Sequence, residues 1–255
     1  MSAPRDDFWQ DLRRSLAIWR AEPRLPVFSL LVWGVPALPS AIGIDSLVFL
    51  VWSLIFVGWA GTEQEWYRRS LAGEPMRWLE IWSITRRYFG RFLRLTLAAL
   101  ALLGILLVLS ILSLLISDRP LAGAASTGRL WIVPVFATYV AATFIAPALT
   151  FTTSSAREAI KIGLRLLREQ RRAAAPYALI LAAVLTFSTD PGVEPLFGPA
   201  AGLAANGFAI LASLAVTGAT VFFYLRHSPQ VAGMMPASGG SQSSRAISPP
   251  ALGDR

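Results

Sequence analysis

The sequence predicts an all-α membrane protein, a polytopic bundle of six transmembrane helices with amphipathic helices at the cytoplasmic interface. Hydrophobic residues make up 55% of the 255-residue chain and charged residues only 15%, with a mean hydropathy of +0.54. Soluble domains carry about 25% charged residues, so this chain is too poor in charge to build an ordinary water-facing surface. Cysteine is absent, which excludes disulfide frameworks and thiolate metal sites.

Six uncharged apolar stretches approach the length needed to cross a bilayer core, about 20 residues per helix. Three prolines interrupt the first stretch, but neighbouring helices can satisfy the freed carbonyls, so we expect a kink near Pro36. The expected spans are residues 26–43, 46–62, 95–117, 130–150, 174–189 and 199–225. They form a six-helix membrane domain over residues 1–227. Residues 228–255 are rich in Ser, Pro and Gly, and we expect a disordered cytoplasmic tail there.

The basic residues test this count independently. With a cytoplasmic N-terminus, 21 of the 23 Lys and Arg residues fall on the cytoplasmic side, and only Arg119 and Arg129 fall on the other. This strong positive-inside bias predicts a multi-pass protein of the cell membrane with both termini cytoplasmic. A cleaved signal peptide is the alternative for the first apolar run. The preceding arm is long and contains four acidic residues, whereas signal n-regions are short and basic.

Each cytoplasmic stretch that precedes a pair of spans has the pattern of an amphipathic interfacial helix. In the first, Asp11 and its neighbouring arginines are expected to point away from an apolar face made of Phe8, Trp9, Leu12, Leu16 and Trp19. In the second, which covers residues 78–93, tryptophans and arginines alternate at helical spacing. Gly73 and Pro75 mark a helix stop followed by a new first turn.

The third amphipathic segment opens with Ser155-Ala-Arg-Glu158, which predicts a capping box between Ser155 and Glu158. Its basic stripe supplies the candidate lipid-headgroup contacts, Arg157, Lys161, Arg165, Arg168 and Arg172. Near an anionic leaflet each would add about 1 kcal/mol of attraction. The expected partners are therefore the lipid bilayer and anionic headgroups. The simpler interpretation is that such helices only anchor loops at the interface.

None of the expected spans contains a charged residue, which weakens the case for ion- or proton-coupled transport. The last span has small residues at helical spacing, which let helix backbones approach closely. The candidate helix-packing residues are Gly198, Gly202, Ala205, Asn206, Ala209 and Ser213. Asn206 could equally contact a substrate. A membrane-protein partner or a homo-oligomer is compatible with this stripe.

No nucleophile elbow, zincin, P-loop or dinucleotide-binding motif is present, and we expect no enzymatic activity, cofactor or metal. The net charge of +8 arises from arginines that flank spans, so nucleic acid is not an expected partner. We expect a non-enzymatic integral membrane protein, that is, a scaffold, assembly or envelope-homeostasis component. The alternative is a transport component or lipid-handling permease, in which Pro147 in the fourth span would help to open a broken-helix site.

The stretch from Phe144 to Arg168 places an apolar-Pro-apolar turn at Pro147, then a small polar gap, then an amphipathic helix with Glu158-Ala159 and Gly163. This pattern resembles the membrane domain that precedes some glycerophosphoryl diester phosphodiesterases, which also occurs alone in six-helix bacterial inner-membrane proteins. Residues 61–74, with the sequence Leu71-Ala-Gly-Glu74 at their end, are similar to the family's link after its second span. The chain has Thr152 and Thr153 where the family often has an acidic residue. It carries no hydrolase domain, so the resemblance implies the fold and not the phosphodiesterase activity.

Overall fold

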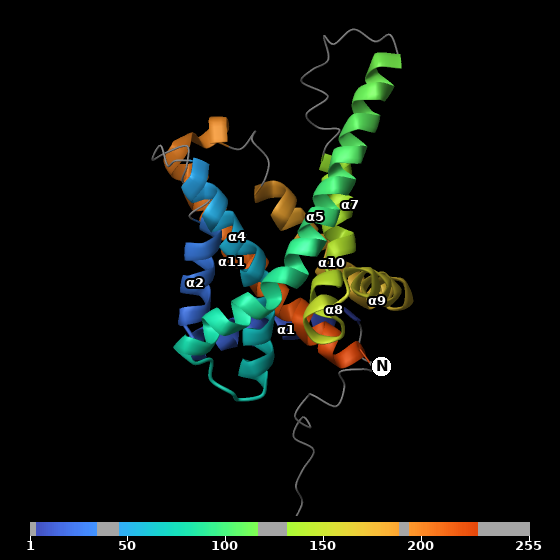
Figure 1. The fold of residues 1–255 in the computed structure, drawn as a ribbon. Helices are drawn as coiled ribbons and strands as arrows, with labels where there is room; N and C mark the ends of the chain where they lie inside the picture. The colour runs from blue at the N-terminus through green and yellow to red at the C-terminus, as the bar shows by residue number, and fades with distance from the viewer. Residues whose placement is uncertain (1–3, 35–45, 117–131, 189–193, 229–255) are drawn as a thin grey trace, which may run out of the picture.

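The computed structural model describes residues 4–34, 46–116, 132–188 and 194–228, and every regular element in these ranges is a helix. The all-α prediction is therefore confirmed for the described part of the chain. Figure 1 shows α2, α4 and α7 running up the view, with α9 lying across the lower end. The helices are α1 (Pro4–Ala21), α2 (Arg24–Gly34), α4 (Ser46–Leu71), α5 (Trp78–Ile116), α7 (Ile132–Ala142), α8 (Ile145–Phe151), α9 (Ala156–Glu169), α10 (Arg171–Ser188) and α11 (Glu194–His227).

Within the described residues, Ala204–His227 is the one helical segment that is long and apolar enough to cross a bilayer. Two shorter apolar helical segments, Arg24–Gly34 and Phe136–Phe151, accompany it. Length and composition of the long segment support membrane association of the chain, whereas the number of spans stays a prediction. The expected kink at Pro36 and the tail 228–255, apart from Ser228, lie outside the described residues.

The second amphipathic segment and the third expected span form one continuous helix, α5. Its lower part crosses the base of the molecule in Figure 1 and the rest rises beside α7. The predicted stop before it is confirmed, because Gly73 adopts a left-handed φ of 72° and α4 ends at Leu71. Glycines let α4 and α5 pack closely, since a Cβ at Gly61 would lie only 2.6 Å from the ring of Tyr88.

Aromatic side chains fill the core at the lower end of the bundle. The ring centroids of Tyr177 and Phe223 are 4.7 Å apart, and those of Phe144 and Phe223 are 5.4 Å apart. The Tyr67 hydroxyl accepts a hydrogen bond from Trp19 Nε1 at 2.7 Å and donates to the carbonyl of Leu214 at 3.0 Å. Buried rings with satisfied polar ends provide large apolar contact without unpaired groups. This core joins α1, α4, α8, α10 and α11.

The first amphipathic helix is oriented differently from the prediction. Asp11 is fully buried, whereas Trp9 and Leu16 of the expected apolar face are 56% and 41% exposed. Asp11 accepts a hydrogen bond from the Tyr177 hydroxyl at 2.7 Å and pairs with Arg226 near the end of α11. Burial raises the pKa of the Asp11 carboxyl, against the opposing effects of Tyr177 and Arg226. These partners are distant in sequence, so the helical pattern alone could not reveal them.

The predicted capping box at the start of α9 is wrong in its contacts, although the helix begins where it was expected. Ser155 occupies the N-cap position, but its side chain makes no capping hydrogen bond. Its backbone N–H donates to Thr153 Oγ1 at 3.1 Å. Glu158 instead pairs with Lys161 at 3.0 Å, one turn along the helix. Ser155 and Glu158 therefore do not bond to each other: Ser155 is bonded to Thr153, and Glu158 to Lys161.

Candidate functional site

A buried carboxylate, Glu63, lies on α4 one residue beyond the expected second span. Only 4% of it is exposed. Its Oε1 accepts hydrogen bonds from the indole N–H groups of Trp33 on α2 and Trp59 on α4, each at 2.7 Å. Trp59 stands four residues before Glu63, which places both side chains on the same face of the helix. Two rigid donors from two helices therefore fix one oxygen of the carboxylate.

Glu63 has no cationic partner among the described residues, where no arginine or lysine lies within 4.0 Å of it. Glu65, two residues along the same helix, behaves differently. Its carboxylate pairs with Arg68 at 2.8 Å and with Arg69 at 3.3 Å. Buried charges in proteins are ordinarily paired or bound to a cation. Burial raises the pKa of the Glu63 carboxyl to about 7, so above that pH Glu63 is a negative group whose charge no described side chain balances.

A cavity of about 150 Å³ lies beside Glu63, where α2, α4, α7, α8, α10 and α11 converge. Most of its wall is apolar, and several polar side chains interrupt that wall. The polar lining consists of Glu63, Gln64, Tyr139, Thr143, Thr217 and Thr220. A water molecule occupies about 30 Å³ in the liquid, so the cavity has room for a small ligand and a few waters. An apolar pocket with a few converging polar groups is the usual form of a small-ligand site.

The cavity borders a break in the fourth expected span. Helix α7 ends at Ala142 and α8 begins at Ile145, with Thr143 and Phe144 between them. Pro147 has no N–H to donate to the carbonyl of Thr143, four residues earlier, so one helical hydrogen bond is missing next to this break. Thr143 and Pro147 both line the cavity. The structure thus places a helix break at the proline that the sequence singled out.

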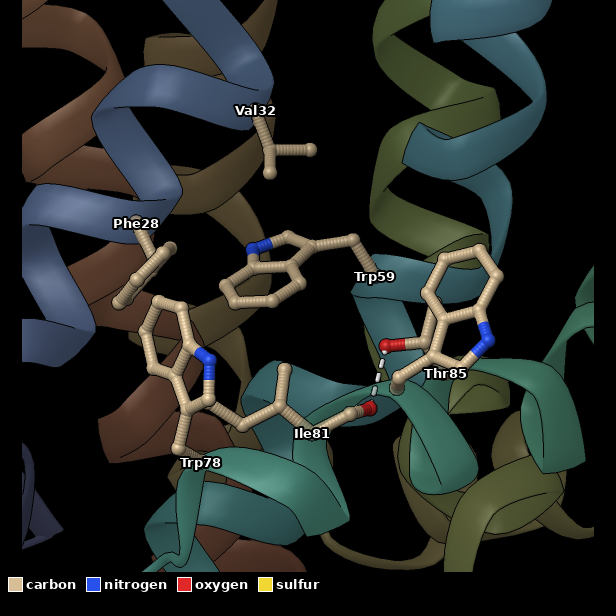
Figure 2. A pocket seen from close by; sticks show the side chains of 7 residues that line it. Phe28, Val32, Trp59, Trp78, Ile81 and Thr85 are labelled. Carbon is tan, nitrogen blue, oxygen red and sulfur yellow. Dashed lines mark hydrogen bonds between the residues drawn. The ribbon is translucent and has the colours of Figure 1, made fainter.

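An apolar groove lies on the other side of Trp59. Figure 2 shows Trp59 facing Phe28 and Val32 of α2, with Trp78, Ile81 and Thr85 of α5 below it. The groove has a volume of about 220 Å³ and presents little polar surface. The Thr85 hydroxyl is bonded to the carbonyl of Ile81 at 2.8 Å. Trp59 therefore contributes to this groove and also donates to Glu63, so it links the two sites.

The basic side chains of the third amphipathic segment are all exposed. Four of the five candidate headgroup contacts, Arg157, Lys161, Arg165 and Arg168, lie on α9, whereas Arg172 lies on α10. The opposite face of α9 is buried through Ala159, Gly163 and Leu166. Leu164 is 43% exposed and shares a surface hollow with Lys161 and Arg165. Leu164 therefore lies on the same side of α9 as the basic residues.

The candidate packing residues all fall on α11. The surroundings of Gly198 and Gly202 lie outside the described residues, while Ala205 and Asn206 are half-buried and Ala209 is buried. The Ser213 hydroxyl donates to the carbonyl of Ile210 at 2.8 Å. Asn206 is not part of the lining of the Glu63 cavity. The tightest described approach on α11 is at Gly218, which the stripe omits. A Cβ there would lie 2.3 Å from Ser15 Oγ and 2.5 Å from the ring of Tyr67.

Sequence reasoning missed Glu63 because the residue follows the last uncharged position of the expected span. A signal was present in its helical neighbours. The residues three and four positions away are Trp59, Ala60, Trp66 and Tyr67, which form a face without a basic residue. The corresponding neighbours of Glu65 include Arg68 and Arg69. An acidic side chain on an aromatic face is expected to be buried, and one beside arginines is expected to pair at the surface.

The described residues contain no group of three or more His, Cys, Asp or Glu side chains that could hold a metal ion. No protein-family model matches the chain, and no curated protein or solved structure is significantly similar to it. The resemblance to the membrane domain of glycerophosphoryl diester phosphodiesterases therefore stays a prediction.

Proposed function

We propose that this chain is a non-enzymatic, multi-pass membrane protein with six spans and both termini in the cytoplasm. The observation that carries the proposal is the apolar surface that the described protein leaves uncovered. On α5 the side chains of Leu97, Leu100, Ile105 and Val108 are 55% to 59% exposed. They belong to the uncharged run 95–116. An exposed apolar surface of this extent marks contact with lipid or with another protein.

Helices α2 and α11 also expose large apolar side chains. Val27 and Leu31 are 53% and 51% exposed, and Phe208 is 75% exposed. Single exposed apolar residues are ordinary in soluble proteins, but here they recur on three helices of a chain with 15% charged residues. Hydrocarbon contact around the bundle accounts for this pattern without requiring a partner for each helix.

The contacts at the lower end of the bundle support the even number of spans. Asp11 in the N-terminal arm pairs with Arg226, which follows the last span. Trp19 of the same arm donates to Tyr67, which lies in the segment after the second span. The segments that the charge bias assigns to the cytoplasm thus touch one another. That arrangement is expected when they share one side of the membrane.

In this proposal α9 rests on the headgroups with its four basic side chains outward, and the bundle serves as a scaffold, assembly or envelope-homeostasis component. Its buried face holds it against α8, because a Cβ at Gly163 would lie 2.7 Å from the backbone nitrogen of Ile145. The basic face of α9 is therefore held in a fixed position by the bundle. A fixed basic surface attracts anionic lipid electrostatically.

Cysteine labelling tests the topology directly, because the chain contains no cysteine of its own. Single variants Ser83→Cys, Gln170→Cys and Ser126→Cys are expressed in cells and treated with a membrane-impermeant maleimide. We expect labelling of Ser126→Cys in intact cells. Ser83→Cys and Gln170→Cys are expected to react only after permeabilisation. Labelling of Ser83→Cys and Gln170→Cys from opposite sides would refute the six-span arrangement.

A second candidate function is a transport component or lipid-handling permease. The break between α7 and α8 beside the Glu63 cavity favours it, since broken helices in transporters expose backbone carbonyls to solutes. Uptake into proteoliposomes that contain the purified chain tests this alternative. Flux above that of empty vesicles for at least one solute supports it, and no flux across a broad panel of solutes counts against it.

A further inference from the structure

We propose that the cavity beside Glu63 is a binding site for a small monovalent cation. The proposal names a ligand class for the second candidate function, a transport component. Only the biological role of the site rests on that candidate function. The first supporting observation is the unbalanced charge. Glu63 is 4% exposed, and this burial raises the pKa of its carboxyl to about 7, against the opposing hydrogen bonds from Ser29, Trp33 and Trp59. Above that pH the carboxylate is ionised, and below it a proton balances its charge. No described cationic side chain compensates this charge.

The hydrogen bonds of the lining threonines supply the second observation. The Thr143 hydroxyl donates its proton to the carbonyl of Tyr139 at 2.9 Å, and the Thr220 hydroxyl donates to the carbonyl of Val216 at 2.8 Å. Each hydroxyl has one proton and two lone pairs, so both oxygens keep acceptor capacity once the proton is used. Both threonines line the same cavity as Glu63. A lining of this kind suits a cation and not an anion.

Charge and size then select the class of cation. One carboxylate balances one positive charge, so a divalent ion would leave an excess charge within a mostly apolar wall. The absence of any cluster of three metal-ligating side chains in the described residues agrees with this choice. A volume of about 150 Å³ admits Na⁺, K⁺ or NH₄⁺ with a few waters. It excludes a bulky organic cation such as N-methylglucamine.

The experiment measures thermal unfolding of the full-length protein in detergent, followed by tryptophan fluorescence. Chlorides of Na⁺, K⁺ and NH₄⁺ are titrated separately against N-methylglucamine chloride at constant ionic strength and at a pH well above 7, where the Glu63 carboxyl is ionised. We expect at least one small cation to raise the unfolding midpoint along a saturable curve, because a ligand that binds the folded state stabilises it. N-methylglucamine is expected to have no such effect. If none of the three small cations gives a saturable rise, the proposal is overturned.

Two variants locate the site, and one serves as a matched control. Glu63→Gln keeps the shape and the acceptor oxygen but removes the charge, so the cation response is expected to disappear. Glu74→Gln removes an acid whose side chain is 58% exposed and should leave the response unchanged. An unchanged response in Glu63→Gln would overturn the proposal.

Thr143→Val keeps the test decisive if Glu63→Gln does not fold. It removes one acceptor oxygen, and cation affinity is expected to fall about tenfold. Unchanged affinity in Thr143→Val, in the absence of folded Glu63→Gln, would also overturn the site. If cation binding is saturable but cysteine labelling contradicts the six spans, the cation site is supported and the proposed membrane topology is refuted. If labelling agrees with the six spans but no cation binds, the topology is supported and the cation site is refuted.

Discussion

Replacing Gly163 by alanine tests how α9 is attached to the bundle. The Cβ of an alanine would lie 2.7 Å from the backbone nitrogen of Ile145 and 2.9 Å from its Cα. These are backbone atoms of α8, so no side-chain rotation can relieve the overlap. The substitution must push α9 away from α8 or distort one of the two helices. We therefore expect Gly163→Ala to destabilise the protein.

The magnitude follows from two opposing effects. Alanine in place of glycine stabilises a helix interior by about 1 kcal/mol. Overpacking of a close contact costs about 1–3 kcal/mol. Gly90→Ala is the matched control, because Gly90 is exposed on α5 and nothing lies within 4 Å of the added Cβ. The control should keep the gain in helix propensity, so the free energies of unfolding of the two variants should differ by about 1–3 kcal/mol.

The assay is thermal unfolding of wild type and both variants in the same detergent. We expect Gly90→Ala to unfold at or above the midpoint of the wild type, and Gly163→Ala to unfold below Gly90→Ala. If Gly163→Ala were as stable as Gly90→Ala, α9 would not be seated against the backbone of α8. The fixed position of its basic face would then lose its structural basis.

Two further predictions concern the polar joint at Asp11 and the basic face of α9. Burial raises the folded-state pKa of Asp11 above its ordinary value of 3.8, so the folded protein binds this proton more tightly than the unfolded chain. Stability of the wild type relative to Asp11→Asn should therefore grow as pH falls through the folded-state pKa of Asp11 towards 3.8, and unfolding midpoints that shift in parallel would contradict this. Adding anionic lipid to zwitterionic micelles should raise the unfolding midpoint of the wild type, because each basic residue gains about 1 kcal/mol near an anionic surface. The gain should shrink when four residues become glutamine, and an equal gain would contradict the headgroup contact. These four are Arg157, Lys161, Arg165 and Arg168.

Local signals in the sequence predicted helix ends well. Gly73 and Pro75 marked the end of α4, and Gly73 adopts the left-handed conformation that a helix stop favours. Ser155 marked the start of α9 at Ala156. Such boundaries depend on residues within a few positions of each other, so they can be inferred from sequence. Pro147 likewise indicated a broken helix, because a missing N–H is a property of the residue itself.

Long-range polar contacts could not be predicted in the same way. Asp11 was expected to face outward because its helix has a basic polar side, yet Tyr177 and Arg226 stabilise it inside the core. The helical pattern reports which residues share a face and does not report what packs against that face. Glu63 is an intermediate case. Its aromatic neighbours on α4 indicated burial, but the donor Trp33 comes from another helix, 30 residues away.

The most direct test of the central claim is extraction of the full-length protein from cell membranes. The proposed contact with hydrocarbon predicts that the protein stays in the membrane pellet after an alkaline carbonate wash and is released by detergent. Release by the wash as a monodisperse particle that remains soluble in plain buffer would contradict the account. The exposed side chains on α5 would then need a cover other than lipid.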